Sequence, residues 1–119
     1  MDNILQLACR LPGRDHLIRL GHAARYGHIV SLRKDGYLIG YAEVYVLDRI
    51  PDHPVRPLPV NVPGGKYLYC YAAVCERNHI RELIRLGKRT FPGCKFIVYH
   101  RLKKNNQLKI ERNEYAESI

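Results

Sequence analysis

A short polar turn, Glu76–Arg81, carries side chains of the types that bind anions. It contains Arg77, Asn78, His79 and Arg81. Cationic side chains at the start of a helix add their charge to the free backbone N–H groups there, and together they hold a phosphate. We expect these four residues and Val74, just before the turn, to form a cofactor-binding site. The alternative is an ordinary solvated helix start with Asn78 as its N-cap.

Two residues in apolar segments are candidates for catalysis. Glu43 lies between Ala42 and Val44, and burial can tune such a carboxylate to deprotonate an amine. Cys70 becomes a nucleophile where its thiolate is stabilised. Each has a structural alternative: Glu43 as an outward-facing polar residue of a strand, and Cys70 as a buried thiol.

Tyrosines alternate along one apolar segment. Tyr67, Tyr69 and Tyr71 are spaced two residues apart, so in a strand their rings share one face. Aromatic rings combined with basic charge bind single-stranded nucleic acid. The alternative is that the rings pack under helices, because both faces of a sheet with a parallel crossover are covered.

The elements that position these residues indicate one α+β domain over residues 1–119. The expected parts are a helical region (1–27), a hairpin (28–47), a Pro-rich loop (48–65), a strand-helix-strand-strand unit (66–112) and a frayed tail (113–119). The hairpin is predicted to turn at Asp35-Gly36, because this dipeptide tolerates positive φ at both central positions. Gly40, in the second strand, predicts a bulge or a close backbone approach.

The unit after the loop predicts a crossover. Strands over 67–74 and 95–101, joined by a helix over 79–91, must pair in parallel with right-handed connectivity. In open sheets such a crossover places a ligand crevice at the C-terminal ends of its strands, here at Val74 to His79. The helix is expected to bury Ile80, Leu83, Ile84, Gly87 and Phe91.

Charge and cysteine usage limit the partners and the compartment. The net charge of +9 favours nucleic acid, an anionic cofactor, an acidic protein or an anionic surface as partner. No apolar run approaches about 18 residues, which predicts no membrane span. The four cysteines, at positions 9, 70, 75 and 94, form no CxxC pair, so we expect free thiols, no metal site and a cytoplasmic protein.

The order of these elements resembles the GNAT acyltransferase fold. The matching features are the Asp35-Gly36 hairpin, the strand from Tyr67 to Val74 and the helix from His79. Among GNAT-like proteins, the chain is most similar to the toxin-activating lysine acyltransferases. These place a Lys-aromatic strand, a helix ending in Phe-Pro and an Arg-bearing strand in sequence, which here are Lys66-Tyr67, Phe91-Pro92 and His100-Arg101.

The resemblance implies N-acyl transfer from a thioester donor, acyl-CoA or an acylated carrier protein, to an amine or lysine. The Asp of the toxin-activating family corresponds to Cys70, and its N-terminal His corresponds to His16 or His22. The catalytic candidates are therefore Glu43, Cys70 and His22. The Gly-rich phosphate turn of GNAT enzymes is replaced by Glu76–Arg81, which contains no glycine.

Two other functions remain open at this point. The chain could be a non-catalytic GNAT-like binding or structural module of a larger assembly, such as a phage or virion particle. Alternatively, its charge and aromatic residues could serve a basic nucleic-acid-binding domain. Fold alone does not choose among these functions.

Overall fold

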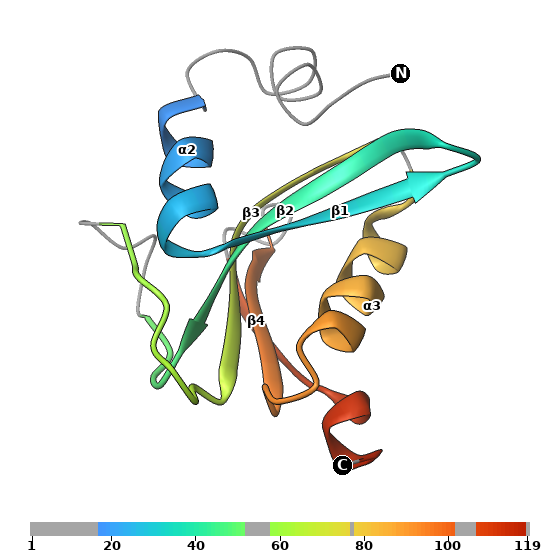
Figure 1. Cartoon of the computed structure of the whole chain (residues 1–119). Helices are drawn as coiled ribbons and strands as arrows, with labels where there is room; N and C mark the ends of the chain where they lie inside the picture. The colour runs from blue at the N-terminus through green and yellow to red at the C-terminus, as the bar shows by residue number, and fades with distance from the viewer. Residues whose placement is uncertain (1–16, 52–57, 77, 102–106, 119) are drawn as a thin grey trace.

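The computed structural model of the chain describes residues 17–51, 58–76, 78–101 and 107–118. It is an α+β fold with a five-stranded mixed sheet in the order β1-β2-β3-β4-β5 and helices α2 and α3 packed against it (Figure 1). The elements are α2 (Leu17–Tyr26), β1 (His28–Lys34), β2 (Tyr37–Leu47), β3 (Tyr67–Cys75), α3 (Ile80–Thr90), β4 (Phe96–Arg101), β5 (Gln107–Arg112) and the 3-10 helix η3 (Glu114–Ser118). Within the described ranges, no helix is long and apolar enough to cross a bilayer.

The predicted hairpin is confirmed. Strands β1 and β2 are antiparallel and turn at Asp35 and Gly36, whose φ angles are 51° and 83°. The close approach at Gly40 is also confirmed: a Cβ there would lie 2.7 Å from the Cys75 sulfur and 3.0 Å from the Val74 carbonyl oxygen. Glycine is needed at position 40 because neighbouring β3 leaves no room for a side chain.

The predicted crossover is confirmed as well. Strands β3 and β4 are parallel neighbours, with Tyr67 opposite Phe96 and Cys70 opposite Tyr99. Helix α3 connects them, and β5 closes the sheet as an antiparallel edge strand.

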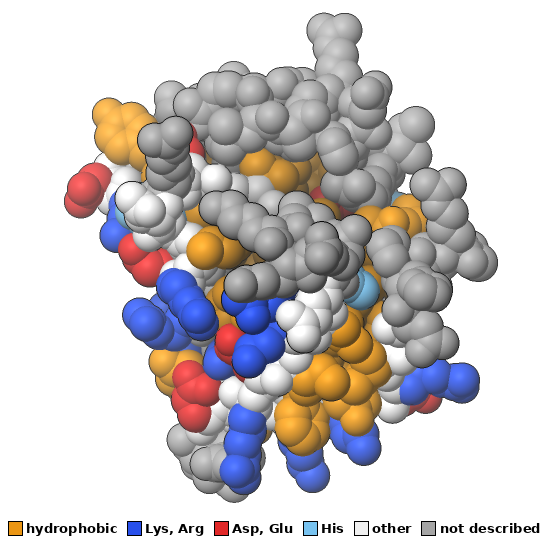
Figure 2. Space-filling model, turned by 180° about the vertical axis from the view of Figure 1, so that it is seen from behind, with side chains coloured by type: hydrophobic (Ala, Val, Ile, Leu, Met, Phe, Trp, Pro, Cys, Tyr) orange, Lys and Arg blue, Asp and Glu red, His pale blue; other side chains and the backbone are white. Residues whose placement is uncertain are grey.

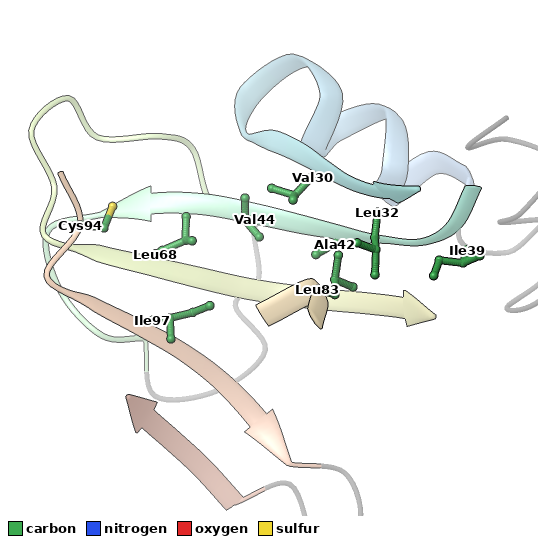
Figure 3. Packing of buried hydrophobic residues seen from close by; sticks show 9 residues of the cluster. All are labelled: Val30, Leu32, Ile39, Ala42, Val44, Leu68, Leu83, Cys94 and Ile97. Atoms are coloured by element: carbon green, nitrogen blue, oxygen red, sulfur yellow. The ribbon is translucent and has the colours of Figure 1, made fainter. Parts of the chain in front are cut away.

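One apolar cluster lies between the sheet and α3 (Figure 3). It contains Val30, Leu32, Ile39, Ala42, Val44, Leu68, Leu83, Cys94 and Ile97. Helix α3 packs on the sheet at Gly87, where a Cβ would make ordinary van der Waals contact with the Leu68 side chain at 3.6 Å. The buried face of α3 differs from the prediction at both ends: Ile80 is 45% exposed, whereas Lys88 is buried.

Helix α2 covers the other face of the sheet. Among the residues of α2 whose burial is described, Leu20 and Ala23 are buried, and they pack near Tyr41 and Tyr45 of β2. The turn into β1 lies directly on β2, since a Cβ at Gly27 would be 2.6 Å from the Tyr45 ring. Both faces of the first strands are therefore covered.

The end of the Pro-rich loop bonds to β2 beyond Val44, the last residue of β2 that pairs with β1. The Val46 backbone N–H of β2 donates to the Asn61 side chain at 2.8 Å, and its carbonyl accepts from the Val62 N–H at 2.7 Å. The Asn61 N–H also donates to the Tyr26 carbonyl at 2.8 Å. These hydrogen bonds hold the end of the loop against β2 and the end of α2. Residues 52–57 lie outside the described part of the chain.

The segment predicted as a frayed tail packs against α3. Asn113 is 1% exposed, and its side-chain amide donates to the carbonyl oxygens of Lys88, Phe91 and Cys94 at 3.1, 3.2 and 2.8 Å. These include the carbonyls left open where a helix ends. The prediction of a frayed segment was wrong for Asn113 because its contacts come from residues distant in sequence.

Candidate active site

Strands β3 and β4 separate part-way along their length. Their parallel pairing ends at Cys70 and Tyr99. Beyond this point β3 continues to Cys75, paired with β2, while β4 continues to Arg101, paired with β5. We call the space between the two diverging ends the split. It lies at the C-terminal ends of parallel strands, where open sheets bind ligands.

A bulge in β3 marks the beginning of the split. Val44 lies opposite Cys70 and Glu43 lies opposite Ala72, so Tyr71 is an extra residue without a direct partner in the β2 register. Bulges bend a strand and redirect its side chains, and they are common beside active sites. Here the bulge bends β3 at the residue where β4 leaves it.

The first residue of β4 beyond the parallel pairs is His100, and it contacts a tyrosine. Its Nε2 lies 3.1 Å from the Tyr69 hydroxyl, and the two rings meet edge to face with centroids 5.9 Å apart. Tyr69 is fully buried; burial, aided by nearby Tyr71 and Cys70, raises its pKa to about 12. The Tyr69 hydroxyl therefore keeps its proton at neutral pH and orients the half-buried imidazole at the split.

His100 is not among the catalytic residues predicted from the sequence, although it belongs to the His100-Arg101 part of the family pattern. The feature that marks His100 as a candidate is its position, directly after the four residues of β4 that pair with β3. The length of that pairing cannot be read from composition or periodicity.

Glu43 and His22 lie on the face of the sheet that α2 covers. Side chains alternate along a strand. Ala42 and Val44 belong to the α3 cluster, so Glu43 lies on the opposite side with Tyr45. The His22 ring contacts the Tyr45 ring at a centroid distance of 6.0 Å and donates from Nε2 to the Pro59 carbonyl at 2.8 Å.

The burial of Glu43 limits its chemistry. It is 0% exposed, so the expectation that it faces outward was wrong. A general base must come within hydrogen-bond reach of the proton that it removes. A buried carboxylate under α2 does not meet that condition for an amine arriving from solvent.

Cys70 lies on the α3 side, at the last parallel pair. Burial, together with the negative charge of Glu43, raises its pKa to about 12. Its thiol donates to the Ala72 carbonyl at 3.7 Å. The protonated thiol is a poor nucleophile at neutral pH, and this geometry agrees with the structural alternative for Cys70.

The start of α3 is occupied by an ion-pair cluster. His79 is the N-cap residue and makes no side-chain capping bond, while Asn78 adopts a left-handed φ of 67°. The expectation that Asn78 is the N-cap was therefore wrong. The Glu82 carboxylate lies 3.0 Å from His79 Nδ1 and 2.9 Å from Lys34 Nζ, and hydrogen bonds from Lys34 and His79 lower the pKa of Glu82.

The other predicted cofactor residues do not meet at this helix start. The Arg81 guanidinium points to Glu111 of β5, at 3.4 Å. Val74 packs with the cluster under α2, next to Tyr41. Arg77 lies outside the described residues, as does His16.

The tyrosines are mainly core residues. Tyr41, Tyr45 and Tyr69 are 0% exposed, and the partly buried Tyr67 stacks on Phe96 with centroids 5.6 Å apart. The packing alternative is confirmed for these rings, and no open aromatic platform forms from them.

Cys70, Cys75 and Cys94 are free thiols, and Cys9 lies outside the described residues. In the part of the chain that the structure describes, no group of His, Cys, Asp and Glu side chains could hold a metal ion.

Comparisons with known proteins do not assign the chain to a family. No protein-family model, curated protein or solved structure matches it. The site is therefore defined by the geometry of this chain: the split, the bulge at Tyr71 and the Tyr69–His100 pair.

Proposed function

We propose that this chain is a GNAT-like N-acyl-transfer protein whose thioester donor lies in the split between β3 and β4. The observation that carries the proposal is the end of parallel pairing at Cys70 and Tyr99, after which both strands continue apart. The edge of β3 that faces the split, Tyr71–Cys75, offers backbone groups along which an extended acyl-carrier arm can lie.

The reaction would be attack of an amine on the thioester carbonyl. The C–N bond forms, the C–S bond breaks, and the thiol leaves with a proton. A backbone N–H beside the bulge would stabilise the oxyanion, and His100 would take the proton of the attacking amine.

The start of α3 is a poor site for the phosphates of such a donor, whereas the split is a better site for its acyl arm. The Glu82 carboxylate already lies beside His79 and Lys34, so an incoming phosphate would meet a negative charge. We therefore propose that the thioester arm supplies most of the binding, whether the donor is acyl-CoA or an acylated carrier protein.

The test is donor consumption by the full chain. Acyl-CoA of several chain lengths is mixed with a lysine peptide, and the acylated peptide is measured by mass spectrometry. His100→Gln should lower the rate by about 100-fold, the lower range of general-base effects. Tyr69→Phe should lower it less. His28→Gln, at an exposed histidine of β1 outside the split, is the matched control and should leave the rate unchanged.

A second candidate is a non-catalytic GNAT-like module of a larger assembly. The ion-pair cluster at Glu82 favours it, because that cluster occupies the helix start that a phosphate-bearing donor would use. If no thioester donor raises the melting temperature at about millimolar concentration, the acyl-transfer proposal fails and this second function is preferred.

A further inference from the structure

The outer side of α3 carries three arginines at helical spacing: Arg81, Arg85 and Arg89. All three are exposed. Residues four apart on a helix are neighbours about 6 Å from one another, so the guanidinium groups form a continuous row. We call this row the arginine stripe. Figure 2, which shows the molecule from behind, has Lys and Arg side chains on the left and at the centre with acidic side chains among them, and further basic side chains along the lower edge and at the right.

Among the residues that the structure describes, ion pairs neutralise only part of this charge. Arg81 lies 3.4 Å from Glu111, but among the described residues Arg85 and Arg89 form no ion pair. Glu82, the acidic residue of α3, is already paired with Lys34 and His79. Two positive charges therefore face solvent together on one rigid helix.

The basic surface continues from α3 onto the sheet. Arg101 of β4 and Lys109 of β5 are exposed. Both side chains lie on the side of the sheet that faces α3, the side that also carries Tyr99 and Glu111. The charges of Arg81 and Arg101 both act on the Tyr99 hydroxyl and favour a lower pKa for it, so both guanidinium groups lie in the surroundings of Tyr99. The stripe is thus the centre of a wider basic face.

We infer that the arginine stripe binds the phosphate backbone of a nucleic acid. Guanidinium groups bind phosphate in a bidentate manner, and charge alone supplies sequence-independent binding of this kind. The row itself consists of arginines, and Leu83 and Gly87 of α3 face the core. The exposed Ile80 is the first residue of the helix and precedes the row. An acidic protein would require an apolar centre for a stable interface, and a membrane surface would require apolar side chains on the outer face of the helix.

The test measures binding of a labelled single strand, about 30 nucleotides long, and of the matching duplex, across a salt series. The stripe variant Arg85→Ala with Arg89→Ala should weaken binding about 10-fold or more. It should also reduce the slope of log K against log salt by roughly 1.5. Both side chains are exposed, so the melting temperature should not change.

The matched control removes the same charge elsewhere. Arg25→Ala with Arg49→Ala deletes two exposed arginines from α2 and the turn after β2. It should change affinity by less than about 2-fold and leave the salt slope intact. Equal losses in the two variants would mean diffuse attraction and would overturn the inference.

Two further outcomes would also overturn it. One is the absence of oligonucleotide binding at about 50 mM salt, where phosphate contacts are strongest. The other is displacement of the oligonucleotide by polyglutamate at equal charge, since that would show an acidic-protein surface. Acyl-CoA consumption does not enter this test, so the inference and the proposed function can fail independently.

Discussion

The two ends of α3 are built in opposite ways. At its C-terminal end, Asn113 and Lys88 are buried and bonded to distant segments. At its N-terminal end, the N-cap residue makes no side-chain capping bond, and the nearby contacts are partly exposed ion pairs around Glu82. The C-terminal end is fixed by buried hydrogen bonds. The ion pairs at the N-terminal end can be replaced by water and salt, so they hold this end less firmly.

The largest expected effect lies at the C-terminal end. Asn113→Ala removes the amide that donates to the carbonyls of Lys88, Phe91 and Cys94. The Phe91 carbonyl keeps the Cys94 N–H, but the buried carbonyls of Lys88 and Cys94 lose this donor, which is costly. We expect the free energy of unfolding to fall by about 3 kcal/mol and the melting temperature by roughly 10 °C. Urea and thermal unfolding measure both values.

Asn113→Asp is the matched control for this prediction. It keeps the size of the side chain and the oxygen that accepts from the Tyr115 N–H, but it loses the amide donors. It should be destabilised about as much as Asn113→Ala. If the Asp variant kept the parent stability, the three carbonyl bonds would not explain the role of Asn113.

The next effect depends on pH. Burial tends to raise the pKa of Glu111, but hydrogen bonds from Tyr99 and Lys88 outweigh it and leave that pKa below its ordinary value of 4.5. The contacts of Glu111 with Tyr99 and Lys88 therefore stabilise the fold at pH values above its ordinary pKa of 4.5. This stabilisation is lost as the pH falls through the lowered pKa of Glu111 in the folded protein. Lys88→Met should cost about 2 kcal/mol at pH 7, since it leaves a partly buried carboxylate without its cation.

This cost should shrink at acid pH, once the pH has fallen through the lowered pKa and Glu111 is protonated in both proteins. Urea unfolding at pH 7 and at that acid pH provides the measurement. Arg81→Met, which removes a 77% exposed partner of the same carboxylate, should cost less than about 0.5 kcal/mol at either pH. A Lys88→Met penalty that is independent of pH would point to lost packing instead.

The smallest expected effect lies at the N-terminal end. Glu82→Gln removes the carboxylate beside the first turn of α3 and leaves Lys34 and His79 available to an anion. Stability should change little, but CoA should bind about 5-fold more tightly. Glu114→Gln, at the other end of α3, is the control and should not affect CoA binding. Unchanged affinity in Glu82→Gln would place the phosphates away from this helix start.

The contrast between local contacts and contacts with distant residues explains which parts of the fold the sequence could predict. The hairpin at Asp35-Gly36 and the β3-α3-β4 crossover follow from local turn chemistry and periodicity, and both are present. Asn113 bonds to residues 19 to 25 positions away, and polar residues near the end of a chain carry no local sign of such contacts. Its role therefore could not be predicted.

The site was predicted less well than the fold. The crossover predicted a crevice at the C-terminal ends of β3 and β4, and the split lies there. The side chains around it depend on register, which shifts at the bulge between Cys70 and Ala72. That shift, and the short parallel pairing that brings His100 to the split, come from tertiary geometry. Glu43 is buried because α2 covers its face of the sheet, which strand alternation alone cannot reveal.

The Asn113 contact also has a consequence for the order in which the chain folds during synthesis. The β1–β2 hairpin is complete once residue 47 has been made, and it can form early from neighbouring residues. The end of α3 has to wait for Asn113, which is translated 23 residues after Thr90, the last residue of the helix. Until then the Lys88 carbonyl lacks the Asn113 donor, so a nascent chain stopped before residue 113 would carry an α3 that frays at its C-terminal end.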